Sequence, residues 1–158
     1  MPTRSPHALE LKIPPLALVL GFALLMWLAA TCAPGFKLGF PFQPIAAWVI
    51  GSSGIIICLL GVTAFKRAET TVNPTKPESC SSLVTSGIYR RTRNPMYLGF
   101  LLMLAGWAVA QANLMAFLAL PAFVLYLNQF QIQPEERALT TIFGDEFKKY
   151  RSSVRRWI

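Results

Sequence analysis

The sequence predicts an all-α integral membrane protein with four transmembrane helices, and two observations lead to this fold class. Of the 158 residues, 54% are hydrophobic and only 14% are charged, whereas soluble globular domains contain about 25% charged residues. The apolar residues are also collected in long runs without a charge. The three cysteines are scattered, which excludes a disulfide scaffold. We therefore treat residues 1–158 as a single membrane domain.

The first two spans are predicted near residues 14–33 and 45–65. The first run carries no charge, and the second ends at Lys66 and Arg67. A helical span needs about 20 apolar residues, so each run can cross the bilayer once. A cleaved signal peptide is the alternative for the first run. That run, however, is longer than a usual signal-peptide core and lacks a clear A-x-A cleavage site.

The third and fourth spans are predicted to form a helical hairpin. No charge occurs between Tyr97 and Phe130, and this run would extend about 51 Å as one straight helix, which is too long for one crossing. The polar sequence Gln111-Ala112-Asn113 interrupts the run and suits a tight turn. We therefore expect spans near 97–110 and 114–130.

The positions of the basic residues support four spans. With four spans, all of the 15 Lys and Arg residues except Lys37 lie on one side of the membrane, as the positive-inside rule requires. Three spans would place the basic tail on the opposite side. The formal net charge of +8 thus reflects orientation and contact with lipid rather than binding of nucleic acid. We expect a multi-pass protein of a prokaryotic inner membrane with both termini and Cys80 in the cytoplasm.

Several classes of function are disfavoured by the positions of the ionisable residues. All seven acidic residues lie outside the spans, whereas an ion-coupled transporter usually keeps an ionisable group at membrane depth. The single histidine, His7, lies in a polar tail, so neither a catalytic triad nor a metal site is predicted. A stripe of small residues in the second span indicates helix packing; its members are Gly51, Gly54, Cys58 and Gly61.

Two cytoplasmic segments, 70–97 and 131–158, contain the candidate functional residues. The first combines a Pro- and Ser-rich loop with three arginines and Asn94-Pro95. In the second, Pro134 and Glu135-Glu136 suit a first helical turn. An apolar stripe follows at helical spacing and predicts an amphipathic helix on the membrane interface, provided that the helix continues through Gly144. The residues of the stripe are Leu139, Ile142, Phe143, Phe147, Tyr150, Val154 and Trp157. Taken singly, these features need no function beyond lipid anchoring, helix capping and interaction with the helix dipole.

Taken in order, three blocks of sequence resemble the isoprenylcysteine carboxyl methyltransferase family. The blocks are L-V-T-S-G-I-Y, R-N-P-M-Y-L-G and P-E-E-R-A-L-x-x-x-F-G-D-E-F-x-x-Y-x-x-x-V-R-R-W-I, within roughly residues 70–158. The N-P-M-Y block is also similar to membrane phospholipid N-methyltransferases. The resemblance implies a membrane enzyme that transfers a methyl group from S-adenosyl-L-methionine to a small or lipophilic carboxylate, amine or thiol.

The resemblance also implies a cytoplasmic cofactor pocket formed by the loop and the C-terminal helix. It assigns cofactor binding to Ser82, Leu83, Val84, Tyr89, Arg93, Asn94, Pro95, Tyr97 and Glu135. A carboxylate can accept hydrogen bonds from ribose hydroxyls or an ammonium group, and tyrosine rings suit adenine and a sulfonium cation. Arg93 suits the cofactor carboxylate or lipid anchoring equally well. Only the resemblance selects Glu135 over Glu136.

Two positions depart from the family pattern. Asn94 stands where the family has a histidine, and Gln131 stands where the eukaryotic enzymes carry an arginine proposed to hold the substrate carboxylate. Gln131 is therefore a candidate substrate-binding residue, and a prenylcysteine carboxylate is disfavoured as the acceptor. Methyl transfer depends mostly on positioning, so no catalytic base is assigned. The alternatives are an NADPH-dependent membrane reductase related to sterol reductases and a non-catalytic membrane scaffold.

Overall fold

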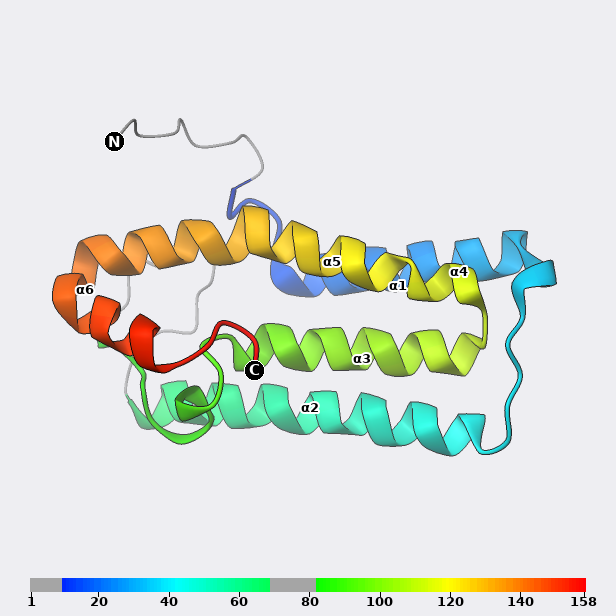
Figure 1. Cartoon of the computed structure of the whole chain (residues 1–158), viewed down its shortest axis with the longest axis horizontal. Coiled ribbons are helices and arrows are strands. Elements are labelled where there is room, and N and C mark those ends of the chain that lie inside the picture. Colours follow the sequence, from blue (N-terminus) through cyan, green and yellow to red (C-terminus); the bar gives the residue numbers. More distant parts are fainter. Residues whose placement is uncertain (1–9, 69–81) are drawn as a thin grey trace.

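The protein is a bundle of long helices, seen in a computed structural model that describes residues 10–68 and 82–158 (Figure 1). Every regular element in these two ranges is helical. The main helices are α1 (Pro15–Cys32), α2 (Gln43–Arg67), α3 (Pro95–Gln111), α4 (Leu114–Phe117), α5 (Ala119–Leu127) and α6 (Gln133–Ser153). Short 3-10 turns occupy Pro34–Phe36 and Gly87–Arg90, and a π-helical segment occupies Asn128–Ile132. Residues 70–81 of the expected cofactor region, with Cys80, lie outside the described ranges.

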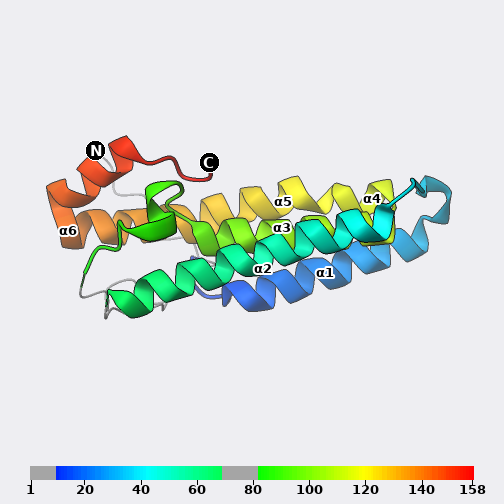
Figure 2. The same ribbon diagram turned by 90° about the horizontal axis from the view of Figure 1, so that it is seen from below.

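The helices of the bundle run along one common axis, and α6 continues beyond them (Figures 1 and 2). Within the described ranges, three helical stretches are long and apolar enough to cross a membrane: α1, α2 and the stretch that begins at Leu114. The apolar helix α3 has 17 residues. These findings support an integral membrane protein, and helices α1 and α2 coincide with the apolar runs near 14–33 and 45–65. The count of four spans stays a prediction.

The hydrophobic core lies between α1, α3 and α5. Met26, Leu104 and Phe123 are almost completely buried there, and the rings of Phe22 and Phe123 pack edge to face at 5.2 Å. By contrast, many large apolar side chains of α1 and α2 point outward, as Trp48 does with 78% of its surface exposed. An apolar exterior of this kind suits a lipid environment, because lipid tails take the place of a protein core.

Small residues bring α2 and α3 into close contact, as the stripe in the second span predicted. A Cβ atom added to Gly54 would lie 2.5 Å from the Gly99 carbonyl oxygen. The Cys58 thiol donates a hydrogen bond to the Met96 carbonyl oxygen at 3.3 Å. The stripe therefore serves helix packing.

The turn expected at residues 111–113 is present, and Asn113 fixes it. Ala112 adopts a left-handed conformation with φ of 45°. The Asn113 carboxamide oxygen accepts from the Met115 amide at 2.9 Å, which caps α4. Its amide nitrogen donates to the carbonyl oxygens of Ala30 and Ala33 at 3.2 and 2.8 Å. Asn113 thus joins the hairpin turn to the end of α1.

The helix that contains the fourth predicted span does not end near residue 130, because it continues through the π-helical segment into α6. Pro134 has no amide hydrogen to give to the Phe130 carbonyl oxygen four residues earlier. Instead, the Leu11 amide donates to that oxygen at 3.0 Å. Gly144, with φ of 50° and ψ of −119°, then bends α6 and turns its second arm back towards α3 (Figures 1 and 2). The uninterrupted amphipathic helix expected to reach Trp157 does not form.

Candidate functional site

The two segments singled out in the sequence meet at the end of the bundle where α6 bends. After α6, the chain returns to the start of α3 and is hydrogen-bonded to it. The Arg93 amide donates to the Arg155 carbonyl oxygen at 3.0 Å. The Arg156 carbonyl oxygen accepts from the Thr92 hydroxyl at 3.2 Å and from the Asn94 side-chain amide at 3.0 Å. Asn94 is therefore held by the C-terminal segment, directly before α3 begins.

Tyr97 and Glu135 form the most direct link between the two predicted segments. The Tyr97 hydroxyl, on the first turn of α3, donates to the Glu135 carboxylate at 2.5 Å. Only 5% of the Tyr97 surface is exposed. Burial raises the pKa of Glu135 to about 8, the adjacent Glu136 also raises it, and the hydrogen bond from Tyr97 lowers it. Such a carboxylate is readily ionised by a cationic group placed beside it.

Tyr89 lies next to this pair. It belongs to the 3-10 turn before α3, and its ring packs edge to face on Phe65 of α2 at 5.4 Å. Its carbonyl oxygen accepts from the Tyr150 hydroxyl at 2.7 Å. The hydroxyls of Tyr89 and Tyr97 are close enough to interact electrostatically. The structure thus brings together Tyr89, Tyr97 and Glu135.

The remaining residues predicted for the cofactor site lie in the described part of the connection between α2 and α3, or at the start of α3. The Ser82 hydroxyl donates to the Ala68 carbonyl oxygen at 3.2 Å. Val84 is buried in a small apolar cluster with Tyr89, and Leu83, the residue before Val84, is partly buried. Pro95 occupies the first turn of α3, where its missing amide hydrogen has no consequence.

Glu136 has a larger role than a first-turn carboxylate in the helix dipole. Its Oε1 accepts from Arg93 at 2.9 Å and from the Arg156 Nε at 3.2 Å, and its Oε2 accepts from Arg156 at 2.7 Å. Only 8% of its surface is exposed. Arg93 also donates to the Arg151 carbonyl oxygen at 3.0 Å. Sequence reasoning missed this ion-pair network, because its members lie 20 and 43 residues from Glu136.

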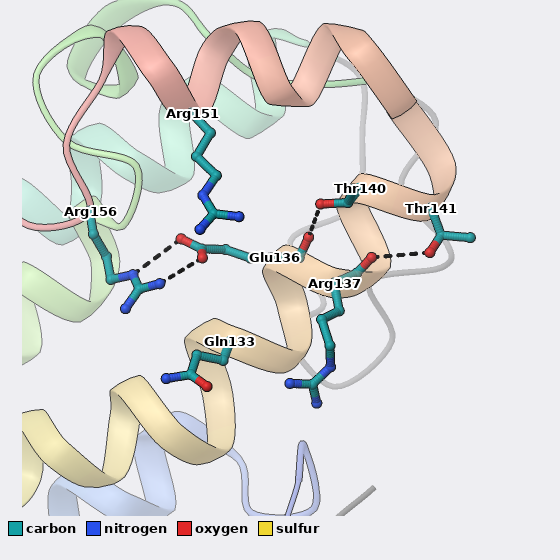
Figure 3. Close-up of a pocket in the computed structure, with 7 residues that line it drawn as sticks. All are labelled: Gln133, Glu136, Arg137, Thr140, Thr141, Arg151 and Arg156. Atoms are coloured by element: carbon teal, nitrogen blue, oxygen red, sulfur yellow. Dashed lines mark hydrogen bonds and ion pairs between the residues drawn. The ribbon is translucent and has the colours of Figure 1, made fainter. Parts of the chain in front are cut away.

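A cavity of about 690 Å³ opens beside Glu136, between the two arms of α6 (Figure 3). We call it the bend pocket, and its lining residues are Gln133, Glu136, Arg137, Thr140, Thr141, Arg151 and Arg156. It contains none of the residues that the sequence assigned to the cofactor. The neighbouring carboxylates of Glu135 and Glu136 therefore serve two different places, the first facing Tyr97 and the second facing the bend pocket.

Gln131 lies one turn before Glu135, in the π-helical segment. Its side chain is fully buried. The side-chain amide nitrogen donates to the Ile13 carbonyl oxygen at 2.8 Å, whereas the amide oxygen has no hydrogen-bond partner in the part of the chain that the structure describes. π-Helical segments occur frequently at functional sites, and buried polar atoms normally have partners.

Comparison with known proteins identifies related sequences. A family model described as phospholipid methyltransferase matches residues 42–146. An uncharacterised protein of Haemophilus influenzae is 46% identical over 63 residues, which are 40% of this chain and 100% of that protein. A probable protein-S-isoprenylcysteine O-methyltransferase of Oryza sativa subsp. indica is 33% identical over 118 residues, 68% of this chain and 60% of that protein. A methanethiol S-methyltransferase of Pseudomonas deceptionensis is 33% identical over 92 residues, 56% of this chain and 32% of that protein.

These similarities confirm the resemblance seen in the sequence. The chain spans about three fifths or less of the length of the named methyltransferases described above. The matched region extends from the start of α2 to just beyond the bend of α6, and so includes both Tyr97 and Glu135. Because the family model covers more than half of the sequence, the chain belongs to the phospholipid methyltransferase family.

Proposed function

We propose that this protein is a membrane-embedded methyltransferase that uses S-adenosyl-L-methionine and acts on a small or lipophilic acceptor at the cytoplasmic face. The contact between Tyr97 and Glu135 carries the proposal. These residues lie 38 positions apart, in separate blocks of the family resemblance, and meet at one end of the bundle. Tyr89, from the first block, lies beside them.

The charge state of this cluster suits the proposed cofactor. Burial raises the pKa of Glu135 to about 8, and its carboxyl group has no ion-pair partner within residues 10–68 and 82–158. A ligand with an ammonium group and ribose hydroxyls would supply charge-assisted hydrogen bonds to it. The tyrosine rings would offer π-faces to adenine and to a cationic sulfur. Ser82, Leu83, Val84, Arg93, Asn94 and Pro95 complete the proposed cofactor site.

Positioning is the main task that methyl transfer leaves to the protein. S-adenosyl-L-methionine, when bound, would supply a methyl group on a positively charged sulfur, which would pass to a lone pair of the acceptor while the electrons of the carbon–sulfur bond return to sulfur. Glu135 and Tyr97 would hold the donor side of this alignment, with Tyr89 as one wall. A proton on the acceptor is released to water, and no residue of this chain is assigned to remove it.

Gln131 indicates which acceptors fit. Its fully buried amide oxygen lacks a partner among the described residues, while its amide nitrogen is occupied by Ile13. The group of Gln131 that is left to bind a substrate is therefore its amide oxygen, which accepts hydrogen bonds. This oxygen suits a substrate that bears an amine, thiol or hydroxyl rather than a carboxylate. We expect tritiated methyl transfer to lipid amines or small thiols to exceed transfer to farnesylcysteine. Preferential labelling of farnesylcysteine would contradict this acceptor class.

Calorimetric titration with S-adenosylhomocysteine in detergent tests the cofactor assignment. Glu135→Gln keeps the size and one acceptor but removes the charge, so we expect about ten- to a hundred-fold weaker binding. Glu146→Gln is the matched control, because Glu146 is exposed on the same helix; its affinity should equal that of the wild type. Circular dichroism checks that both variants are folded.

The same titration separates the competing functions. Binding of NADPH without binding of S-adenosylhomocysteine would favour the reductase. Binding of neither ligand would favour a scaffold. Equal affinity for S-adenosylhomocysteine in the wild type and Glu135→Gln would remove Glu135 from the site.

A further inference from the structure

The bend pocket carries a surplus of positive charge that the proposed methyl transfer does not use. Three arginines line it, against the single carboxylate of Glu136. Both oxygens of this carboxylate are bound by Arg156, and one also binds Arg93. Arg137 pairs with Glu10 at 2.6 Å. The side chain of Arg151 has no acidic partner within residues 10–68 and 82–158.

The arginines are crowded around this one carboxylate. Figure 3 shows the Arg151 side chain extending into the pocket towards Glu136 and Arg156. Burial lowers the pKa of Arg93, as do Arg156 and Arg151 nearby, while Glu136 raises it. An anion in the pocket would relieve this repulsion. The planar guanidinium groups of arginine bind phosphate through paired hydrogen bonds, and Arg156 is already fixed in place by Glu136.

The hydroxyl groups of the pocket further restrict which ligands would fit. Thr140 donates its hydroxyl hydrogen to the Glu136 carbonyl oxygen at 2.6 Å, and Thr141 donates to the Arg137 carbonyl oxygen at 3.1 Å (Figure 3). Because each hydrogen is engaged, the remaining lone pairs can only accept. They therefore suit hydroxyl donors on a ligand. The cavity of about 690 Å³ also has room for more than an inorganic anion.

We propose that the bend pocket binds a phosphate ester that carries hydroxyl groups, with Arg151 and Arg156 on the phosphate and Thr140 and Thr141 on the hydroxyls. Two sources have this chemistry: a phosphoglycerol lipid headgroup and a soluble polyol phosphate. Gln133, at the start of α6, follows shortly after the fourth predicted span, which is expected to end near residue 130. The pocket is thus within reach of headgroups.

The experiment measures binding to purified protein in neutral detergent. Glycerol 1-phosphate is titrated by calorimetry, and phosphatidylglycerol is compared with phosphatidylcholine by native mass spectrometry. Arg151→Gln removes the unpaired guanidinium, and Lys149→Gln is the control, since it removes the same charge from an exposed position of the same arm outside the pocket. We expect saturable binding to the wild type, about tenfold or greater weakening in Arg151→Gln, and no change in Lys149→Gln.

The outcomes distinguish the sources and the competing explanations. Selective binding of phosphatidylglycerol alone identifies a headgroup site, binding of glycerol 1-phosphate alone identifies a soluble ligand, and binding of both supports the shared chemistry. Equal losses in the two variants, or no saturable binding of either probe, would overturn the proposal. Affinity for S-adenosylhomocysteine should be unchanged in Arg151→Gln; its loss would assign the pocket to the cofactor site instead. Glycerol phosphate binding without any S-adenosylhomocysteine binding would leave this inference standing and remove the methyltransferase.

Discussion

The adjacent carboxylates of Glu135 and Glu136 have different partners, and the sequence alone does not predict which. Glu135 and Glu136 both flank the apolar stripe of the sequence, so periodicity alone does not separate them. In the structure, one accepts from Tyr97 and the other binds Arg93 and Arg156. Successive residues of a helix point about 100° apart, which allows two neighbours to serve different sites. The distinction depends on partners that are distant in the chain, and no local signal encodes it.

The raised pKa of Glu135 makes cofactor binding depend on pH. Below about 8 the carboxyl group is largely protonated, and a ligand that donates hydrogen bonds or carries a positive charge favours the ionised form. We expect the affinity for S-adenosylhomocysteine, relative to that of Glu135→Gln, to rise between about pH 6.5 and pH 9. Calorimetric titrations across this range measure it, with Glu135→Gln correcting for ionisation of the ligand itself. A constant ratio would contradict the assignment.

The raised pKa of Glu135 makes the stability of the folded protein fall with rising pH, whereas the affinity for the cofactor rises. The folded-state pKa of about 8 exceeds the ordinary value of 4.5. Between these values the folded protein binds more protons than the unfolded chain. The resulting stabilisation is complete below about pH 4.5 and is lost as the pH rises through about 8.

Glu136 should matter for stability rather than for methyl transfer. Glu136→Gln leaves the guanidinium groups of Arg93 and Arg156 without their shared counter-charge in a largely buried position. We expect the free energy of unfolding to fall by about 1.5–3 kcal/mol. Reversible unfolding in mixed micelles measures this loss, and Glu146→Gln provides an exposed control on the same helix. Similar stability of the two variants would show that the network contributes little.

At the scale of elements, hydropathy located the helices well but not their junctions. The expected spans 14–33 and 45–65 correspond to Pro15–Cys32 and Gln43–Arg67, because runs of apolar residues alone determine them. The π-helical segment had no such signal. Pro134 ordinarily marks a new helix start, and the donor to the carbonyl oxygen four residues before it is Leu11, which is far away in the sequence. The sequence did not determine whether the helix would bend at Gly144, because glycine adopts helical and left-handed backbone conformations about equally well.

The close approach of α2 and α3 gives a test at this scale. In Gly54→Ala, the new methyl group would lie 2.5 Å from the Gly99 carbonyl oxygen, so the two helices must separate. Overpacking of this kind costs about 1–3 kcal/mol. Gly51→Ala on the same helix meets nothing within 4 Å and should be neutral or gain up to about 1 kcal/mol of helix propensity. Thermal unfolding in detergent compares the two, and equal melting temperatures would contradict the packing.

For the whole molecule, the distribution of charge predicts the orientation in the membrane. Cys32 is exposed at the end of α1, which lies at the end of the bundle opposite the bend of α6 (Figure 1). Cys80 belongs to the connection between α2 and α3, which the sequence predicts to be cytoplasmic. In intact cells, an impermeant maleimide should therefore label a variant that keeps only Cys32 and spare one that keeps only Cys80.

Inverted vesicles should give the reverse labelling pattern. Labelling of Cys80 from outside would invert the topology and place the Tyr97–Glu135 cluster on the other face of the membrane. Labelling of both residues from the same side would change the number of spans.

The hydrogen bonds between residues 92–94 and residues 155–156 also set an order of events during synthesis. Asn94 and the Arg156 carbonyl oxygen that it contacts are 62 residues apart. At translation rates of about 5–20 residues per second, the start of α3 leaves the ribosome roughly 3–12 s before its partner. During this interval α3, α4 and α5 can already form, but the side-chain amide of Asn94 lacks its partner, the Arg156 carbonyl oxygen. The helices of the bundle can therefore form before the contacts that join residues 92–94 to residues 155–156.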